Sequence, residues 1–136
     1  MAKLLVGYDG SDGAKKALER AASLLANGEA VGVISVAPVI TGGPRSGGPF
    51  APGDGPQEHR AELAEAERYL TGRGIQSVAI TASGEPGRAI CEVAERDGYD
   101  TIVVGSRNLS APKRLMLGSV STAVAHNAHC DVLIVK

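Results

Sequence analysis

Short apolar runs alternate along the chain with segments in which apolar residues recur every three or four positions. Five of the runs are rich in aliphatic and β-branched residues. They predict buried strands, because a parallel sheet that is covered on both faces needs no polar alternation. These runs are residues 4–6, 31–36, 77–81, 101–104 and 132–135.

Four helices are predicted between the strands. In the first, apolar residues follow helical spacing over residues 14–25, and Ser11 and Asp12 offer side-chain oxygens to the first free N–H groups. Asn27-Gly28 provides a stop signal. Strict alternation of strand and helix predicts an α/β domain with a doubly wound parallel sheet. The other three helices are residues 57–71, a segment from Pro86 to about Asp97-Gly98, and a segment that begins at Gly118-Ser119.

Residues 38–56 interrupt this pattern. They hold most of the prolines and many of the glycines, with no periodicity, and so predict a long loop. A linker between domains is disfavoured, because the 37 residues before it are too few to fold alone. Loops of this length are usually functional or disordered, so a lid over a ligand site and an idle insertion both remain open. The chain is therefore expected to form one domain over residues 1–136.

Composition excludes several classes of protein. Hydrophobic residues make up 43% and charged residues 21%, which is typical of a globular domain. A net charge of −1 and only 3% aromatic residues argue against binding to nucleic acid or to an anionic membrane. No apolar stretch has the length of a transmembrane helix or of a signal-peptide core, so a cytoplasmic protein is expected. Cys91 and Cys130 form no CxxC pair and are expected to be reduced thiols.

Candidate chemistry gathers where the fourth strand ends. Gly105 lets a ligand approach the backbone closely, and Gly118 opens a helix whose free N–H groups favour an anion. Ser119 and Ser121 add hydroxyl donors, and Lys113-Arg114 lies just upstream. The combination predicts a phosphate site that is neither a Walker A loop nor a dinucleotide fingerprint. Simpler interpretations stay open: Gly105 only ends a strand, Ser119 only caps a helix, and Asp9 only satisfies a turn.

The same residues carry a family resemblance. Gly105-x2-Asn108-x9-Gly118-Ser119-Val120-Ser121 resembles the ATP-binding motif of the universal stress protein family, G-x2-G-x9-G-[ST]. Residues 4–11, 84–86 and 130–136 are similar to that family as well, so the likeness spans essentially the whole chain. One departure is Asn108, which replaces the second glycine of the motif. Asn tolerates positive φ better than most residues, so we expect binding to be retained in a weakened form.

The resemblance implies a Rossmann-like sheet in the order 3-2-1-4-5 with four helices, of the adenine nucleotide alpha hydrolase type. It implies ATP as the ligand, with or without Mg²⁺, and leaves ADP and AMP as alternatives. Asp9 would meet the nucleoside, Val36 would contact adenine through its backbone, and the glycines and serines would hold ribose and phosphates. The full set of candidate nucleotide-binding residues is Gly7, Asp9, Val36, Val104, Gly105, Arg107, Asn108, Gly118, Ser119, Val120 and Ser121.

The resemblance also implies a homodimer that forms through the last apolar run, which consists of Val132, Leu133, Ile134 and Val135. Such a protein would act as a nucleotide-binding regulator in the stress response. Efficient catalysis is not supported, because no paired carboxylates and no Ser-His-Asp order accompany the phosphate loop; at most slow ATP hydrolysis is expected.

Three alternatives remain. The first is an interaction dimer of the same fold with a degraded nucleotide site, and the second is an adenylating enzyme of related fold. The third is a metal site at His126, His129 and Cys130, which is disfavoured because a zinc site needs three or four ligands and the only further histidine is His59.

Overall fold

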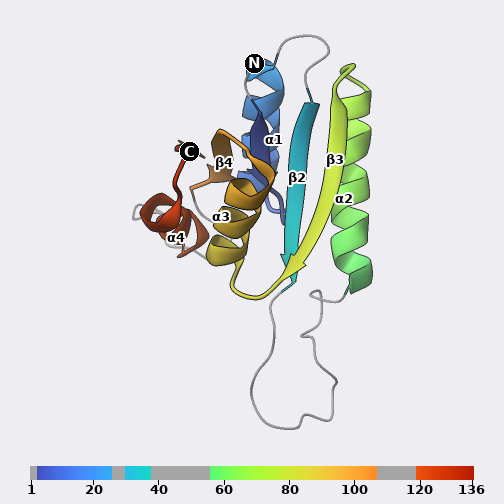
Figure 1. Ribbon diagram of the computed structural model, residues 1–136. Coiled ribbons are helices and arrows are strands. Elements are labelled where there is room, and N and C mark those ends of the chain that lie inside the picture. Colours follow the sequence, from blue (N-terminus) through green and yellow to red (C-terminus); the bar gives the residue numbers. More distant parts are fainter. Residues whose placement is uncertain (1–2, 26–29, 38–55, 107–118) are drawn as a thin grey trace, which may run out of the picture.

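The computed structural model describes residues 3–25, 30–37, 56–106 and 119–136, with the backbone alone at 56–59 and at 119. Five strands and four helices alternate in these described ranges, in the order predicted from the sequence (Figure 1). They are β1 (Leu4–Gly7), α1 (Asp12–Leu24), β2 (Ala30–Ala37), α2 (Pro56–Thr71), β3 (Gln76–Ser83), α3 (Pro86–Asp97), β4 (Thr101–Gly105), α4 (Ser119–Asn127) and β5 (Asp131–Val135).

The strands form one parallel sheet in the order β3-β2-β1-β4-β5. This result confirms the expected fold class and strand order. Leu4 of β1 lies opposite Val31 of β2 on one side and Thr101 of β4 on the other. β1 is therefore the central strand, between β2 and β4, and the chain reverses its direction of travel across the sheet between β1 and β4.

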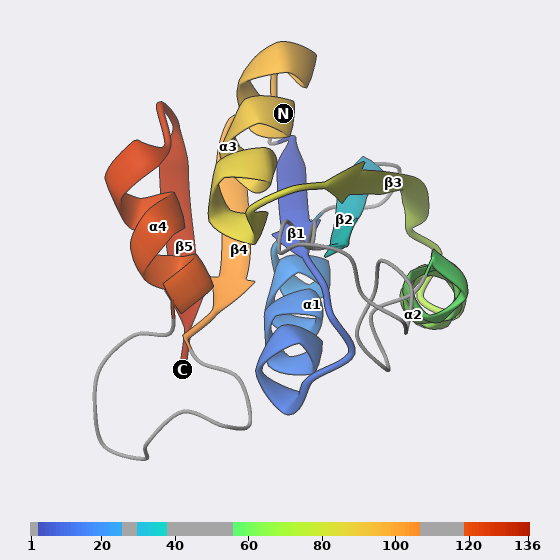
Figure 2. The same ribbon diagram turned by 90° about the horizontal axis from the view of Figure 1, so that it is seen from below.

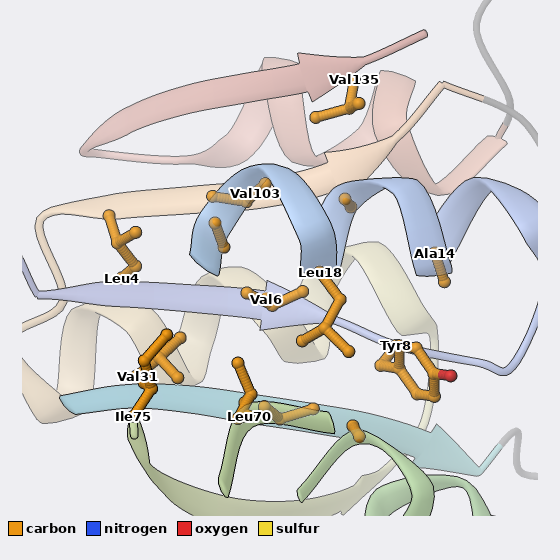
Figure 3. Close-up of a cluster of buried hydrophobic side chains, with 14 of the residues drawn as sticks. Leu4, Val6, Tyr8, Ala14, Leu18, Val31, Leu70, Ile75, Val103 and Val135 are labelled. Carbon is orange, nitrogen blue, oxygen red and sulfur yellow. The ribbon is translucent and has the colours of Figure 1, made fainter. Parts of the chain in front are cut away.

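Helices cover both faces of the sheet. Figure 2 shows α1 and α2 on one face and α3 and α4 on the other. The α1/α2 face is sealed by apolar side chains such as Val6, Leu18 and Leu70, and Tyr8 lies at the end of this cluster (Figure 3). The α3/α4 face is sealed by Leu5, Ile34, Ile90, Ile102 and their neighbours. Alternate residues of β1 thus enter opposite cores, which explains why its run is wholly apolar.

Capping residues set the helix ends. Ser11 has extended backbone, and its Oγ accepts a hydrogen bond from the Ala14 N–H at 3.2 Å, so it is the N-cap of α1. Pro86 is the first residue of α3, where a missing N–H costs nothing. Gly98 ends α3 with a φ of 74°, a left-handed conformation that glycine adopts without strain. Each of these boundaries follows the sequence prediction closely.

Two sequence predictions fall wholly or mostly outside the residues that the structure describes. Helix α1 ends at Leu24, and the predicted stop at Asn27-Gly28 lies outside the described residues. The predicted loop over residues 38–56 also lies outside them, except for Pro56, which begins α2. Within the described ranges, no helix combines the length and the apolar character needed to cross a membrane.

Candidate functional site

The candidate site lies at the carboxyl edge of the sheet, where β1 and β4 run side by side. In open parallel sheets, ligands bind beyond the carboxyl ends of the strands at the point where the strand order reverses. Here that point lies between β1 and β4, and the chain leaves these strands at Gly7 and Gly105. The residues that follow each strand end are therefore the first to consider.

Gly7 and Val104 meet at this edge from neighbouring strands. A β-carbon built on Gly7 would lie 3.2 Å from Cγ1 of Val104 and 3.1 Å from Cδ1 of Ile90. The side chain of Val104 is buried, with 3% of its surface exposed. A ligand at the edge could therefore reach only the backbone of Val104, and Gly7 provides the room in which Val104 and Ile90 pack.

Asp9 holds the turn that joins β1 to α1. Its Oδ1 accepts a hydrogen bond from the Ser11 N–H at 2.9 Å, and Gly10 between them has a φ of 80°. This is the turn chemistry that Asp favours, so the simpler interpretation of Asp9 describes what its carboxylate does in this structure. The residue is exposed beyond the end of β1. Its contact with a nucleoside stays a prediction.

The amino end of α1 packs directly against the end of β4. A β-carbon on Gly105 would lie 2.6 Å from the carbonyl carbon and oxygen of Gly13. No side chain fits at such a separation from a backbone carbonyl, so Gly105 is required by the approach of α1. Helix α1 thereby directs its free N–H groups and the positive end of its dipole to the same edge of the sheet.

The amino end of α4 is joined to the same strand end. The Ser121 hydroxyl donates a hydrogen bond to the carbonyl oxygen of Ser106 at 3.1 Å, and the Ser106 N–H donates to the carbonyl oxygen of Val135 at 2.9 Å. Ser121 is buried, with 1% of its surface exposed. Its hydroxyl, proposed from the sequence as a phosphate donor, is thus engaged with the protein backbone. The first turn of α4 is fixed where β4 ends.

The remaining candidates divide into two groups. Val36 is half-buried near the carboxyl end of β2, and Val120 is half-buried in the first turn of α4; both pack against the cluster on the α3/α4 face. Ser119 is the first residue of α4, with only its backbone described. The other candidates lie outside the described residues, namely Arg107, Asn108 and Gly118, together with Lys113 and Arg114.

A polar cluster near this edge was not identified from the sequence. The Tyr8 hydroxyl donates to Oε1 of Glu65 at 2.6 Å, and the Ser35 hydroxyl donates to Oε1 of Glu62 at 3.3 Å. Burial is the main reason that the pKa of Tyr8 is raised, followed by the hydrogen bond to Glu65 and by the charges of Glu65, Glu62 and Asp9. The two glutamates lie three residues apart on α2, a spacing that places them on one face of the helix.

The metal site that the sequence disfavoured, and the two thiols, have ordinary surroundings. His129 Nε2 lies 3.9 Å from Oε2 of Glu95, and both side chains are largely exposed. In the part of the chain that the structure describes, no three His, Cys, Asp or Glu residues are arranged to hold a metal ion. Cys91 and Cys130 are free thiols. Burial raises the pKa of Cys91, which disfavours its thiolate.

Comparison with known proteins gives one consistent result. The family model described as the universal stress protein family matches residues 1–136. Universal stress protein YxiE of Bacillus subtilis (strain 168) is 37% identical, and the match covers 98% of both chains. Among solved structures, a universal stress protein in complex with cAMP is 28% identical, with a TM-score of 0.76 over 99% of this chain and 97% of that one. The universal stress protein of Archaeoglobus fulgidus in complex with dAMP is 25% identical, with a TM-score of 0.73 over 100% and 98%.

Proposed function

Because the chain belongs to the universal stress protein family, we propose that it is an adenine-nucleotide-binding regulatory protein of the stress response. The two relatives solved with cAMP and with dAMP support the adenine base as the common element of recognition. ATP is the ligand that the glycine-and-serine motif favours, bound with or without Mg²⁺. Slow hydrolysis at most accompanies binding.

The observation that carries the proposal is the meeting of two helix amino ends at one strand end. Helix α1 reaches β4 through the contact of Gly13 with Gly105, and α4 is held there by the hydrogen bond from Ser121 to Ser106. Each helix amino end presents free N–H groups and a positive dipole, which favour the phosphates of a nucleotide. Two such ends at a reversal point of the sheet favour an anionic ligand more than either would alone.

Within this proposal, the candidate residues have distinct roles. Asp9 is exposed beside the amino end of α1, where its carboxylate would accept hydrogen bonds from ribose or adenine. Val36 would present backbone groups to the base edge from the end of β2. The backbone of Gly118 and Ser119 would receive the phosphates, and the buried Ser121 would hold that backbone in place.

The proposal includes a homodimer in the cytoplasm. Strand β5 is one edge of the sheet and pairs only with β4 among the described strands. Three of its residues are only half-buried, which leaves an apolar row for a second copy to cover; they are Val132, Leu133 and Ile134. The whole chain would act as one domain in each subunit.

Mass spectrometry of the ligand released from the purified protein tests the proposal. The protein is purified without added nucleotide, denatured, and the soluble fraction is analysed. We expect an adenine nucleotide, and its mass distinguishes ATP from ADP, AMP and cAMP. A guanine nucleotide or an unrelated small molecule bound in stoichiometric amount would contradict the proposal.

A further inference from the structure

Strand β3 is an edge strand without the features that usually protect edges. It pairs only with β2 among the described strands, and it is eight residues long. Its sequence, Gln-Ser-Val-Ala-Ile-Thr-Ala-Ser, has no charged residue and no proline. Natural edge strands are commonly short, charged or interrupted, since a long uncharged edge is a template for pairing with another strand.

Both faces of β3 are also incompletely covered. None of its eight residues is fully buried, and Val78 has 53% of its surface exposed. Figures 1 and 2 show why: α2 packs along one face of β3, whereas α3 and α4 lie over the middle and the far side of the sheet. Val78 and Leu24 are the exposed large hydrophobic residues of the described chain. Val78 thus adds an aliphatic contact surface to the unpaired backbone of this edge.

We propose that β3 is a self-association edge, at which two copies of the chain pair antiparallel across a twofold axis to join their sheets. Twofold symmetry permits more than one antiparallel register of this strand. In an antiparallel pair, directly opposite residues point to the same face of the sheet. Side chains alternate between faces along each strand, so under a twofold axis normal to the sheet two opposite residues are both even-numbered or both odd-numbered. The register centred on Ile80 pairs all of residues 77–83, and it sets Val78 opposite Ala82 of the second copy, a large side chain against a small one.

Charge at the ends of the strand favours the antiparallel orientation. Arg73 precedes β3 and Glu85 follows it, and both are exposed. Antiparallel alignment brings the Arg73 end of one copy to the Glu85 end of the other, so opposite charges face each other at both ends. A parallel arrangement would instead set like charges side by side.

The contact is weak and depends on concentration, because a single strand pair buries little surface. It is separate from the proposed pairing through β5, at the opposite edge of the sheet. A chain that used both edges would form assemblies larger than a dimer, whereas a chain that used β3 alone would stop at two copies.

Cysteine cross-linking tests the register. In the proposed pairing, Ile80 lies opposite Ile80 of the second copy, at a Cα separation of about 5 Å that permits a disulfide. The two copies of Gln76 lie about 27 Å apart, eight residues along the strand. Under mild oxidation with diamide, Ile80→Cys is expected to form a disulfide-linked dimer at least tenfold faster than Gln76→Cys and the parent protein. Equal rates in Ile80→Cys and Gln76→Cys would overturn the proposal.

Light scattering over a range of concentrations tests the edge itself. Val78→Lys places a charge on the edge, and Leu24→Lys is the matched control because Leu24 is 54% exposed on α1. Neither side chain is buried, so both variants should fold. Association through β3 joins two monomers, or two dimers if the chain already pairs through β5. We expect Val78→Lys to weaken this association at least tenfold and Leu24→Lys to leave it unchanged. Unchanged association in Val78→Lys would refute the proposal. The partner of β3 would then be an extended segment of another protein.

Discussion

Gly105 at the end of β4 and Gly13 in the first turn of α1 pack backbone to backbone, with the Gly13 carbonyl 2.6 Å from the place where a side chain on Gly105 would begin. The two residues lie 92 positions apart in the sequence. This contact brings the amino end of α1 to the strand end from which the candidate phosphate-binding motif continues. The architecture of the candidate site therefore depends on the absence of a side chain at Gly105 as well as on its polar residues.

Substitution of Gly105 by alanine tests this packing. The added methyl group would overlap the Gly13 backbone, which cannot move without shifting α1, so we expect the free energy of unfolding to fall by about 1–3 kcal/mol or more. Gly72→Ala is the matched control, because a β-carbon at Gly72 meets only ordinary contacts at 3.4 Å or beyond. Chemical denaturation of both variants gives the comparison. Equal stability in Gly105→Ala and the parent would show that α1 is not held at this distance.

We expect the free energy of unfolding to fall at alkaline pH because Tyr8 ionises. Its pKa is raised in the folded protein, chiefly by burial and by the Glu65 hydrogen bond, whereas in the unfolded chain it titrates near 10.0. Above that pH the unfolded state releases the proton first, so this contribution to stability is complete below about pH 10 and is lost as the pH rises. Tyr8→Phe should lower stability at pH 7 by about 1–2 kcal/mol and show a shallower decline above pH 10. Parallel pH profiles in parent and variant would contradict this account.

Loss of the Ser121 hydroxyl is expected to destabilise the fold, although Ser121 was predicted from the sequence as a binding residue. Its hydroxyl is buried and donates to the Ser106 carbonyl, so Ser121→Ala should lower the free energy of unfolding by about 1–2 kcal/mol. Ser23→Ala is the control, because the Ser23 hydroxyl also donates to a backbone carbonyl, that of Arg20, but on an exposed helix surface. Thermal unfolding of both variants provides the measurement. A larger loss in Ser23→Ala than in Ser121→Ala would oppose this assignment.

The sequence predicted the fold well because local signals and burial agree in this chain. Each central strand is buried on both faces and reads as an apolar run, and Ser11 and Gly98 mark helix ends by their capping chemistry. The strand order came from the family resemblance, since alternation alone does not choose among doubly wound orders. The site was predicted only in part. The Gly105–Gly13 contact joins distant positions, and a serine beside a helix start is compatible both with a ligand and with a backbone carbonyl.

Asn108 replaces a glycine of the family motif and lies outside the described residues. Asn108→Gly restores the motif and removes only a side chain. We expect the binding free energy of ATP to change by less than about 1 kcal/mol, the scale of one hydrogen bond, because Asn tolerates positive φ. Titration calorimetry of both proteins gives the difference. A gain of more than tenfold in affinity, about 1.4 kcal/mol, would show that the Asn side chain blocks the site.

Isothermal titration calorimetry with Mg-ATP tests the central claim most directly. The parent protein should bind ATP saturably, with a Kd of about 10 μM or a free energy near −7 kcal/mol, and should bind GTP more weakly. Gly118→Val should abolish binding, since a branched side chain would stand where phosphate meets the start of α4, whereas Gly72→Val at the far end of the sheet should bind like the parent. A folded parent that gives no binding heat with ATP, ADP, AMP or cAMP would contradict nucleotide binding and favour a dimer that acts through protein partners.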